Sequence, residues 1–144
     1  MVSKSLAFLG LSASLVVAVG GATSADSTLV VADRIFRTLP SGTLAQRTEA
    51  ASKALLGRPY LLGPLGEGDS LKGEPKPRLR MDVFDCVTYL ETSLALASAT
   101  DTANLLAHMD SIRYRGGEVT WRWRNHFTES EWLVRNAGHH RILR

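Results

Sequence analysis

Apolar residues recur at helical spacing through the first half of the chain, behind a leading apolar run. The segment STLVVADRIFRTL has one apolar face and predicts a short helix that begins at Ser27 or Thr28 and ends before Pro40. That face comprises Leu29, Ala32, Ile35 and Phe36. The T-x-x-Q capping box of Thr43 and Gln46 should open a second helix, which runs to Leu56, with Gly57 just past its end.

Residues 57–78 are rich in glycine and proline and therefore predict a loop, of the kind that often lines a binding cleft. LRMDVF follows as a possible short strand. Asp85 then stands where an N-cap belongs, which makes Cys86 the first residue of a helix. A further helix should span Thr102 to Arg113.

The segment EVTWRWR alternates apolar and polar residues and predicts a strand, with its tryptophans on the core side and His126 continuing the polar face. Thr128 and Glu131 have the spacing of a capping box, and Phe127 and Trp132 fit a hydrophobic staple around it. The helix that they open should end near Asn136. Together these elements predict an α+β fold, helix-rich with a short strand or hairpin.

The first 25 residues carry the features of a secretory signal peptide: Lys4, an apolar run over residues 6–19, and then small residues. The alternative is an uncleaved anchor, which the short run makes less favourable. We therefore expect an exported protein, periplasmic or secreted, with one domain over residues 26–144 and no stable membrane span after cleavage. The formal net charge of +3, which includes Lys4, is a weak bias that suits an anionic envelope polymer but decides little.

Cys86 is the single cysteine, so in an oxidising compartment it is a buried hydrophobe, an intermolecular link or a reactive thiol. A helix N-terminus stabilises the thiolate, the nucleophilic form, because unpaired backbone N–H groups gather there. The negative charge of Asp85 opposes this effect. The location therefore makes Cys86 a candidate nucleophile.

A cysteine nucleophile needs a base, and the chain has four histidines. His126 is the best candidate because it follows Arg122 and Arg124 beside the expected cleft, although it could also fix the turn between strand and helix. His108 belongs to an ordinary helix, and His139 and His140 lie in a tail where disorder is expected. No spacing suits a metal, and no cofactor is indicated. The interleaved arginines and aromatics resemble a single-stranded nucleic-acid platform, but export and low charge argue against nucleic acid as a partner.

Three motifs in order, FDCVTYLE, IRYRGG and RNHFTESEW, resemble the N-acetylmuramoyl-L-alanine amidase-like branch of the NlpC-type, papain-like cysteine hydrolases. The resemblance runs from about Leu55 to Asn136. It implies a cell-wall amidase that cuts N-acetylmuramic acid from L-alanine in muropeptides, with Cys86 as nucleophile and its backbone N–H in the oxyanion hole. The motif positions that could contact substrate or serve as scaffold are Asp85, Glu91, Arg124, Asn125 and His126.

The chain departs from the family pattern at its C-terminal end. The family's catalytic histidine normally follows on a later sheet strand, in an H-x-G pattern, and a third polar residue follows on the next strand. No such segment follows Asn136. The resemblance therefore predicts the N-terminal part of the papain-like domain, with most of the sheet missing, an exposed apolar face and impaired activity. A non-catalytic wall-binding protein or a non-functional fragment are the alternatives.

Overall fold

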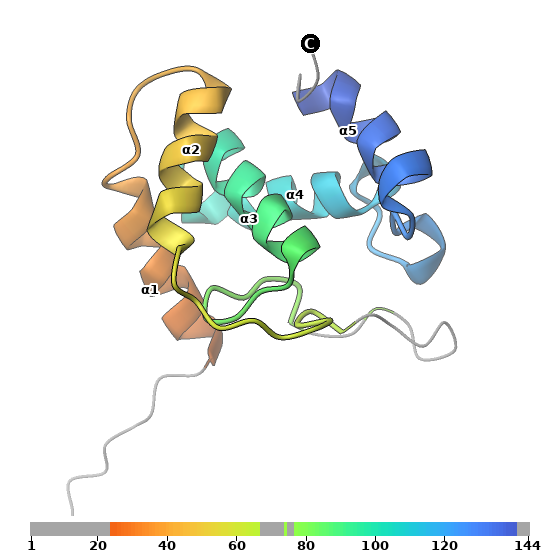
Figure 1. Cartoon of the computed structure of the whole chain (residues 1–144), viewed down its shortest axis with the longest axis horizontal. Helices are drawn as coiled ribbons and strands as arrows, with labels where there is room; N and C mark the ends of the chain where they lie inside the picture. The colour runs from red at the N-terminus through yellow and green to blue at the C-terminus, as the bar shows by residue number, and fades with distance from the viewer. Residues whose placement is uncertain (1–23, 67–73, 75–76, 141–144) are drawn as a thin grey trace, which may run out of the picture.

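The structure is a computed structural model, and it describes residues 24–66, 74 and 77–140. Helices dominate this part of the chain: α1 (Ser24–Phe36), α2 (Leu44–Leu55), α3 (Cys86–Ser98), α4 (Thr102–Arg113) and α5 (Leu133–His140). Three short helical turns, η1 (Arg115–Gly117), η2 (Trp121–Trp123) and the π-helical η3 (Thr128–Trp132), lie between α4 and α5. Figure 1 shows α3 and α4 in the middle of the molecule, with α1 and α2 on one side and α5 on the other.

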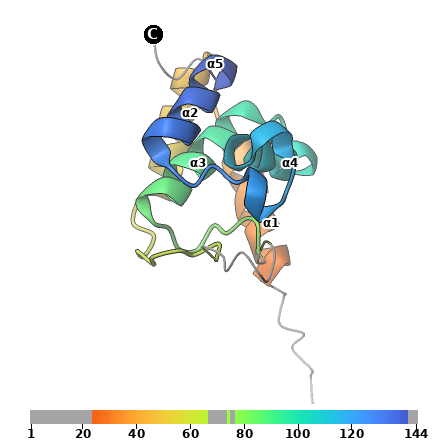
Figure 2. The ribbon, with the colours of Figure 1, turned by 90° about the vertical axis from the view of Figure 1, so that its right-hand side faces the viewer.

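The core lies where α2 and α4 pack against α3, because α3 is buried over most of its length. Its central residues are buried on several faces, as expected for a helix surrounded by other elements. The apolar core includes Ala51, Leu55, Leu94, Leu96, Leu105, Met109 and Ile112. Figure 2, turned by 90°, shows α3 between α2 and α4.

Polar contacts fix α2 against both ends of α3. Arg47 donates from Nε to the carbonyl of Ala97 at 2.7 Å and from Nη2 to that of Ala99 at 2.8 Å. These carbonyls belong to the last turn of α3, where the helix dipole favours a cation. Nearer the start of α3, the Tyr89 hydroxyl donates to the carbonyl of Ser52 at 2.6 Å.

The predicted α+β fold is wrong for the described residues. They contain isolated bridges, Tyr60 with Phe84 and Tyr114 with Arg124, and no strand. The segment expected to form a strand from residue 118 instead turns at η2, where the backbone N–H of Trp123 bonds the carbonyl of Thr120. An alternating sequence forms a strand only beside a pairing partner, and here Tyr114 pairs at one position alone.

Two details of the C-terminal region also differ from expectation. Thr128 makes no capping hydrogen bond, and Phe127 is 67% exposed, so the predicted capping box and staple are absent. The Glu131 carboxylate does not form its half of the box either, since its Oε2 accepts from the backbone N–H groups of His126 at 2.7 Å and Phe127 at 3.3 Å rather than from that of Thr128. The last helix continues beyond Asn136 to His140.

The N-terminal boundary moves as well, because α1 begins at Ser24 rather than at Ser27 or Thr28. Residues 1–23 of the predicted signal peptide lie outside the described residues. No helix in the described part of the chain is long and apolar enough to cross a bilayer.

Candidate active site

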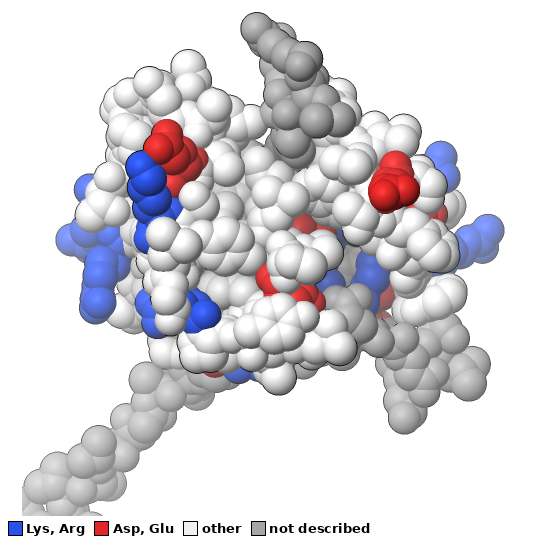
Figure 3. All heavy atoms as spheres, viewed as in Figure 1, with Lys and Arg blue, Asp and Glu red and all other residues white. Residues whose placement is uncertain are grey.

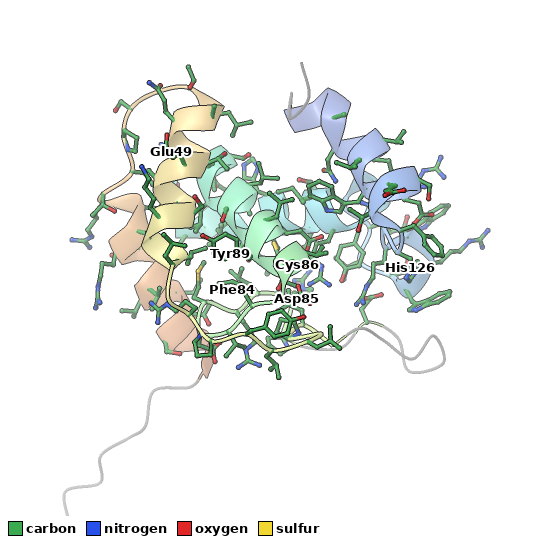
Figure 4. All side chains as sticks on the ribbon, viewed as in Figure 1. Glu49, Phe84, Asp85, Cys86, Tyr89 and His126 are labelled. Atoms are coloured by element: carbon green, nitrogen blue, oxygen red, sulfur yellow. The ribbon has the colours of Figure 1, made fainter. Side chains whose placement is uncertain are left out.

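Cys86 is the first residue of α3, as predicted, and it is exposed. Asp85 caps the helix: its Oδ1 accepts from the backbone N–H and from the hydroxyl of Thr88, both at 2.7 Å. The Thr88 hydroxyl also accepts from the backbone N–H of Asp85 at 3.0 Å, which completes a reciprocal capping box. The N–H groups of Cys86 and Val87 belong to the first turn, where no intrahelical acceptor exists. An exposed thiol therefore stands at the positive end of a well-capped helix (Figure 4).

The glycine-rich loop is attached to the same cap. The backbone N–H of Gly63 donates to Oδ2 of Asp85 at 3.2 Å, and that of Leu61 donates to the carbonyl of Phe84 at 3.0 Å. Gly63 adopts a φ of 60°, a left-handed conformation that favours glycine. The loop runs beside the start of α3 and leaves Tyr60 and Leu62 largely exposed.

A small cleft of about 110 Å³ opens beside the first turns of α3. Its lining combines four charged side chains with apolar and amide groups: Asp85, Val87, Glu91, Arg113, Arg124, Asn125, His126, Thr128 and Trp132. Figure 3 shows acidic and basic atoms together in the hollow right of centre. The cleft thus brings together the five predicted site residues other than Cys86, whose chain neighbours Asp85 and Val87 line it.

Glu91 lies at the buried wall of the cleft, with 4% of its surface exposed. Its Oε1 accepts from Nε1 of Trp132 at 3.0 Å, and its Oε2 lies 3.4 Å from Nε of Arg113, which is also 4% exposed. A buried carboxylate is stable only when charge and hydrogen bonds are supplied, and both are supplied here. These contacts give Glu91 a structural role between α3 and the C-terminal segment.

Arg124 is held in a second buried cluster. Its guanidinium forms an ion pair with Glu74 and donates to the carbonyl of Gly66 at 3.1 Å. The hydroxyl of Tyr114 donates to the same Glu74 carboxylate at 2.9 Å. Burial raises the pKa of Tyr114 above its ordinary value, and the Glu74 carboxylate adds to that rise, so the hydroxyl remains a donor. Arg124 therefore ties the glycine-rich loop to the cleft wall.

Asn125 fixes the backbone that follows. Its side-chain amide donates to the carbonyl of Ile112 at 3.0 Å, and its Oδ1 accepts from Arg135 at 2.5 Å. Its backbone N–H bonds the carbonyl of Arg113 at 2.9 Å. The side-chain amide and the backbone N–H of Asn125 thus both form hydrogen bonds within the fold, which favours a scaffold role.

His126 is exposed and lines the cleft, but its ring is engaged within its own segment. Nε2 lies 2.8 Å from the carbonyl of Trp121, and the two rings pack with centroids 4.5 Å apart. No hydrogen bond joins His126 to Cys86 in the described part of the chain, and Figure 4 places the two residues on separate elements. The structure therefore does not form the Cys86–His126 pair that was considered from sequence.

Three residues of these clusters were not assigned from sequence: Glu74, Arg113 and Tyr114. Arg113 and Tyr114 lie inside the IRYRGG motif, so this motif could have identified them as site residues from the sequence. Glu74 lies in the glycine-rich loop, where no periodic pattern points to a buried partner. Among the described residues, no three histidine, cysteine, aspartate or glutamate side chains gather as a metal site.

A family model described as AmiA-like, N-acetylmuramoyl-L-alanine amidase-like, matches residues 50–143. The chain belongs to this family, so the resemblance seen in the three motifs is confirmed at that level. The papain-like NlpC placement is not supported by these findings. None of the curated proteins compared with the chain matches it significantly.

Two solved structures are similar to the fold. One is a protein of Legionella pneumophila str. Philadelphia 1, of the family DUF1460, with a TM-score of 0.71, 32% identity, and coverage of 80% of this chain and 38% of that one. The other is an N-acetylmuramoyl-L-alanine amidase from Bacteroides uniformis, with a TM-score of 0.56, 20% identity, and coverage of 68% and 41%. At that identity the second likeness concerns the fold alone. The chain therefore spans about two fifths of the length of either neighbour.

Proposed function

We propose that the protein is an exported cysteine amidase that acts on muropeptides, with Cys86 as its nucleophile. The observation that carries the proposal is the exposed thiol at the capped N-terminus of α3, in a chain of the amidase-like family. The signal-like N-terminus supports export to the periplasm or beyond.

The chemistry follows from the first turn of α3. The Cys86 thiolate would attack the carbonyl carbon of the amide between the muramic lactyl group and L-alanine. The N–H groups of Cys86 and Val87 would stabilise the oxyanion of the tetrahedral intermediate. Collapse would form a thioester and release the L-alanine amine, which takes up a proton, and water would then hydrolyse the thioester to the free acid and thiol.

The described residues provide no general base in hydrogen-bond contact with Cys86. His126 is bonded to the carbonyl of Trp121 and makes no hydrogen bond to Cys86 within the described residues. We therefore propose slow turnover by residues 1–144 alone.

The test is hydrolysis of an N-acetylmuramoyl-tetrapeptide, followed by release of free tetrapeptide, with wild type, Cys86→Ala and His126→Ala. Slow release that disappears in Cys86→Ala supports the amidase. Val134→Ala, at an exposed position of α5, is the control and should match wild type. Robust turnover lost in both Cys86→Ala and His126→Ala would instead make these two residues the working pair. Release that is unchanged in Cys86→Ala would contradict the proposal, and muropeptide binding without any release would favour a non-catalytic wall-binding protein.

A further inference from the structure

The segment from residue 121 to residue 127, called the aromatic loop, presents rings at the surface. Trp121 is 38% exposed and Phe127 is 67% exposed, while Trp123 is half-buried. The sequence had predicted that the tryptophans cover a core. An exposed group of aromatic side chains costs free energy in water and is a common mark of a binding surface.

The rings are held in place before any ligand arrives. The backbone N–H groups of Trp123 and Arg124 bond the carbonyls of Thr120 and Trp121, at 3.1 and 3.3 Å. The His126 ring packs on Trp121 and bonds its carbonyl. Because Arg124 is anchored in the buried cluster with Glu74, the turn is fixed to the core. A preorganised surface loses little conformational entropy on binding.

The charges around the aromatic loop argue for a ligand of low charge. Two guanidiniums, of Arg115 and Arg122, lie over the Trp123 ring at 5.1 and 5.3 Å from its centroid. Three carboxylates belong to the same stretch of chain, at Glu118, Glu129 and Glu131. Nucleic-acid surfaces need an excess of free positive charge, which this balance does not provide.

We propose that the aromatic loop is a sugar-binding subsite that takes the N-acetylated amino sugar of a muropeptide. A pyranose ring has an apolar face of C–H groups, which packs on an aromatic ring, and a polar edge, which the guanidiniums can bond. His126 belongs to both the aromatic loop and the cleft, so the subsite continues into the cleft beside the first turn of α3. The assignment rests on the proposed function, since it places the sugar on the acyl side of the bond to be cut.

The test measures binding of a peptide-free probe, the disaccharide of N-acetylglucosamine and N-acetylmuramic acid, to the full chain by titration calorimetry. We expect the dissociation constant to rise at least tenfold in Trp121→Ala and in Phe127→Ala, and to stay near the wild-type value in Trp121→Phe, which keeps a ring. Phe127 is largely exposed, so its replacement leaves the fold intact, as circular dichroism should verify. Val134→Ala, an equally exposed apolar side chain on α5, is the matched control and should bind as wild type does.

Separate arms distinguish this subsite from the amidase proposal. Cys86→Ala should bind the disaccharide normally, because Cys86 lies outside the aromatic loop. If wild type binds the disaccharide but does not hydrolyse the N-acetylmuramoyl-tetrapeptide, the amidase proposal is contradicted and the subsite proposal is supported. Absent disaccharide binding, or equal binding by the ring-deleted variants, would overturn the subsite even if hydrolysis is observed. Preferential, salt-sensitive binding of a single-stranded thymidine oligonucleotide would also overturn it.

Discussion

Asp85 joins two segments at the residue where α3 begins. One carboxylate oxygen caps the helix through Thr88, and the other accepts the backbone N–H of Gly63 in the glycine-rich loop. The same side chain therefore fixes the direction of α3 and the position of the loop beside Cys86. A site residue considered from sequence as a substrate contact proves to be occupied within the fold.

Replacing Asp85 by alanine should lower the free energy of unfolding by about 1–2 kcal/mol, since the first turn loses its acceptor. Asp85→Asn keeps one acceptor oxygen and should cost less. Urea denaturation measures both. Iodoacetamide should label Cys86 in the folded wild type, because the thiol is exposed. Equal unfolding free energies for wild type and Asp85→Ala would show that the cap contributes nothing.

Glu131 holds the backbone of the aromatic loop. Burial raises the pKa of its carboxyl, but the backbone N–H groups of Phe127 and His126, aided by Arg135, outweigh burial, and the net pKa lies below the ordinary 4.5. The folded state therefore binds the proton less tightly than the unfolded state does. The stability that this carboxylate contributes is complete above pH 4.5 and is lost as the pH falls through the lowered value.

We predict that Glu131→Gln lowers the free energy of unfolding at pH 7, and that the difference from wild type shrinks as the pH falls below 4.5. Denaturant titrations at several pH values measure the difference. Glu129→Gln, at an exposed neighbouring carboxylate without these backbone bonds, is the control and should show a smaller pH-dependent difference. A difference for Glu131→Gln that grows toward low pH would contradict the assigned direction of the pKa.

At the scale of elements, two similar capping sequences have different outcomes. Thr43 and Gln46 form the full reciprocal box at the start of α2. Thr128 and Glu131 have the same spacing, yet η3 begins as a π-helical turn in which the threonine hydroxyl makes no capping bond. Glu131 instead accepts from the backbone N–H groups of His126 and Phe127, which precede Thr128, so the local geometry of the turn prevents the box from forming.

These outcomes predict a contrast between two identical substitutions. Thr43→Ala should destabilise the protein by about 1 kcal/mol, because the backbone N–H of Gln46 loses its acceptor. Thr128→Ala should change the free energy of unfolding by less than about 0.5 kcal/mol, as for an ordinary surface site. Thermal or urea unfolding of the two variants side by side measures the contrast. Comparable losses in both would show that Thr128 is a cap after all.

At the scale of the whole molecule, one buried contact connects the nucleophile helix with the C-terminal segment. The indole N–H of Trp132, in η3, donates to Glu91 of α3, which also pairs with Arg113 of α4. Three elements thus meet at one carboxylate at the wall of the cleft. Loss of the indole donor would remove this hydrogen bond from a buried carboxylate.

Trp132→Phe should therefore lower the free energy of unfolding by about 1–3 kcal/mol, although an aromatic ring remains. Trp121→Phe makes the same chemical change at a partly exposed ring and should have a much smaller effect. Calorimetric melting of both variants measures the difference. Equal shifts would mean that the indole bond to Glu91 does not hold the segments together.

Several large apolar side chains are exposed near the nucleophile. They lie at the end of α2, on the glycine-rich loop and on the first turns of α3: Leu56, Tyr60, Leu61, Leu62, Val87 and Leu90. The low stability or partner dependence inferred from such a face stays a prediction.

The sequence by itself determined the elements whose signals are local. The helix Thr102–Arg113, the capping box of Thr43 and the position of Cys86 after an Asp85 cap are confirmed, because caps and helical periodicity depend on neighbours within a few residues. The three motifs likewise identified the family.

Only the tertiary structure decided what joins distant segments. The segment EVTWRWR alternates apolar and polar residues but forms a turn. A strand needs a neighbouring strand to pair with, and the alternation of residues does not show whether one is present. The partners of Glu91 and Arg124, at Trp132 and Glu74, are separated from them by 41 and 50 residues. A buried charge is stable only when the fold brings a partner close to it. Whether Glu91 and Arg124 contact substrate or support the fold could therefore be judged only from the folded chain.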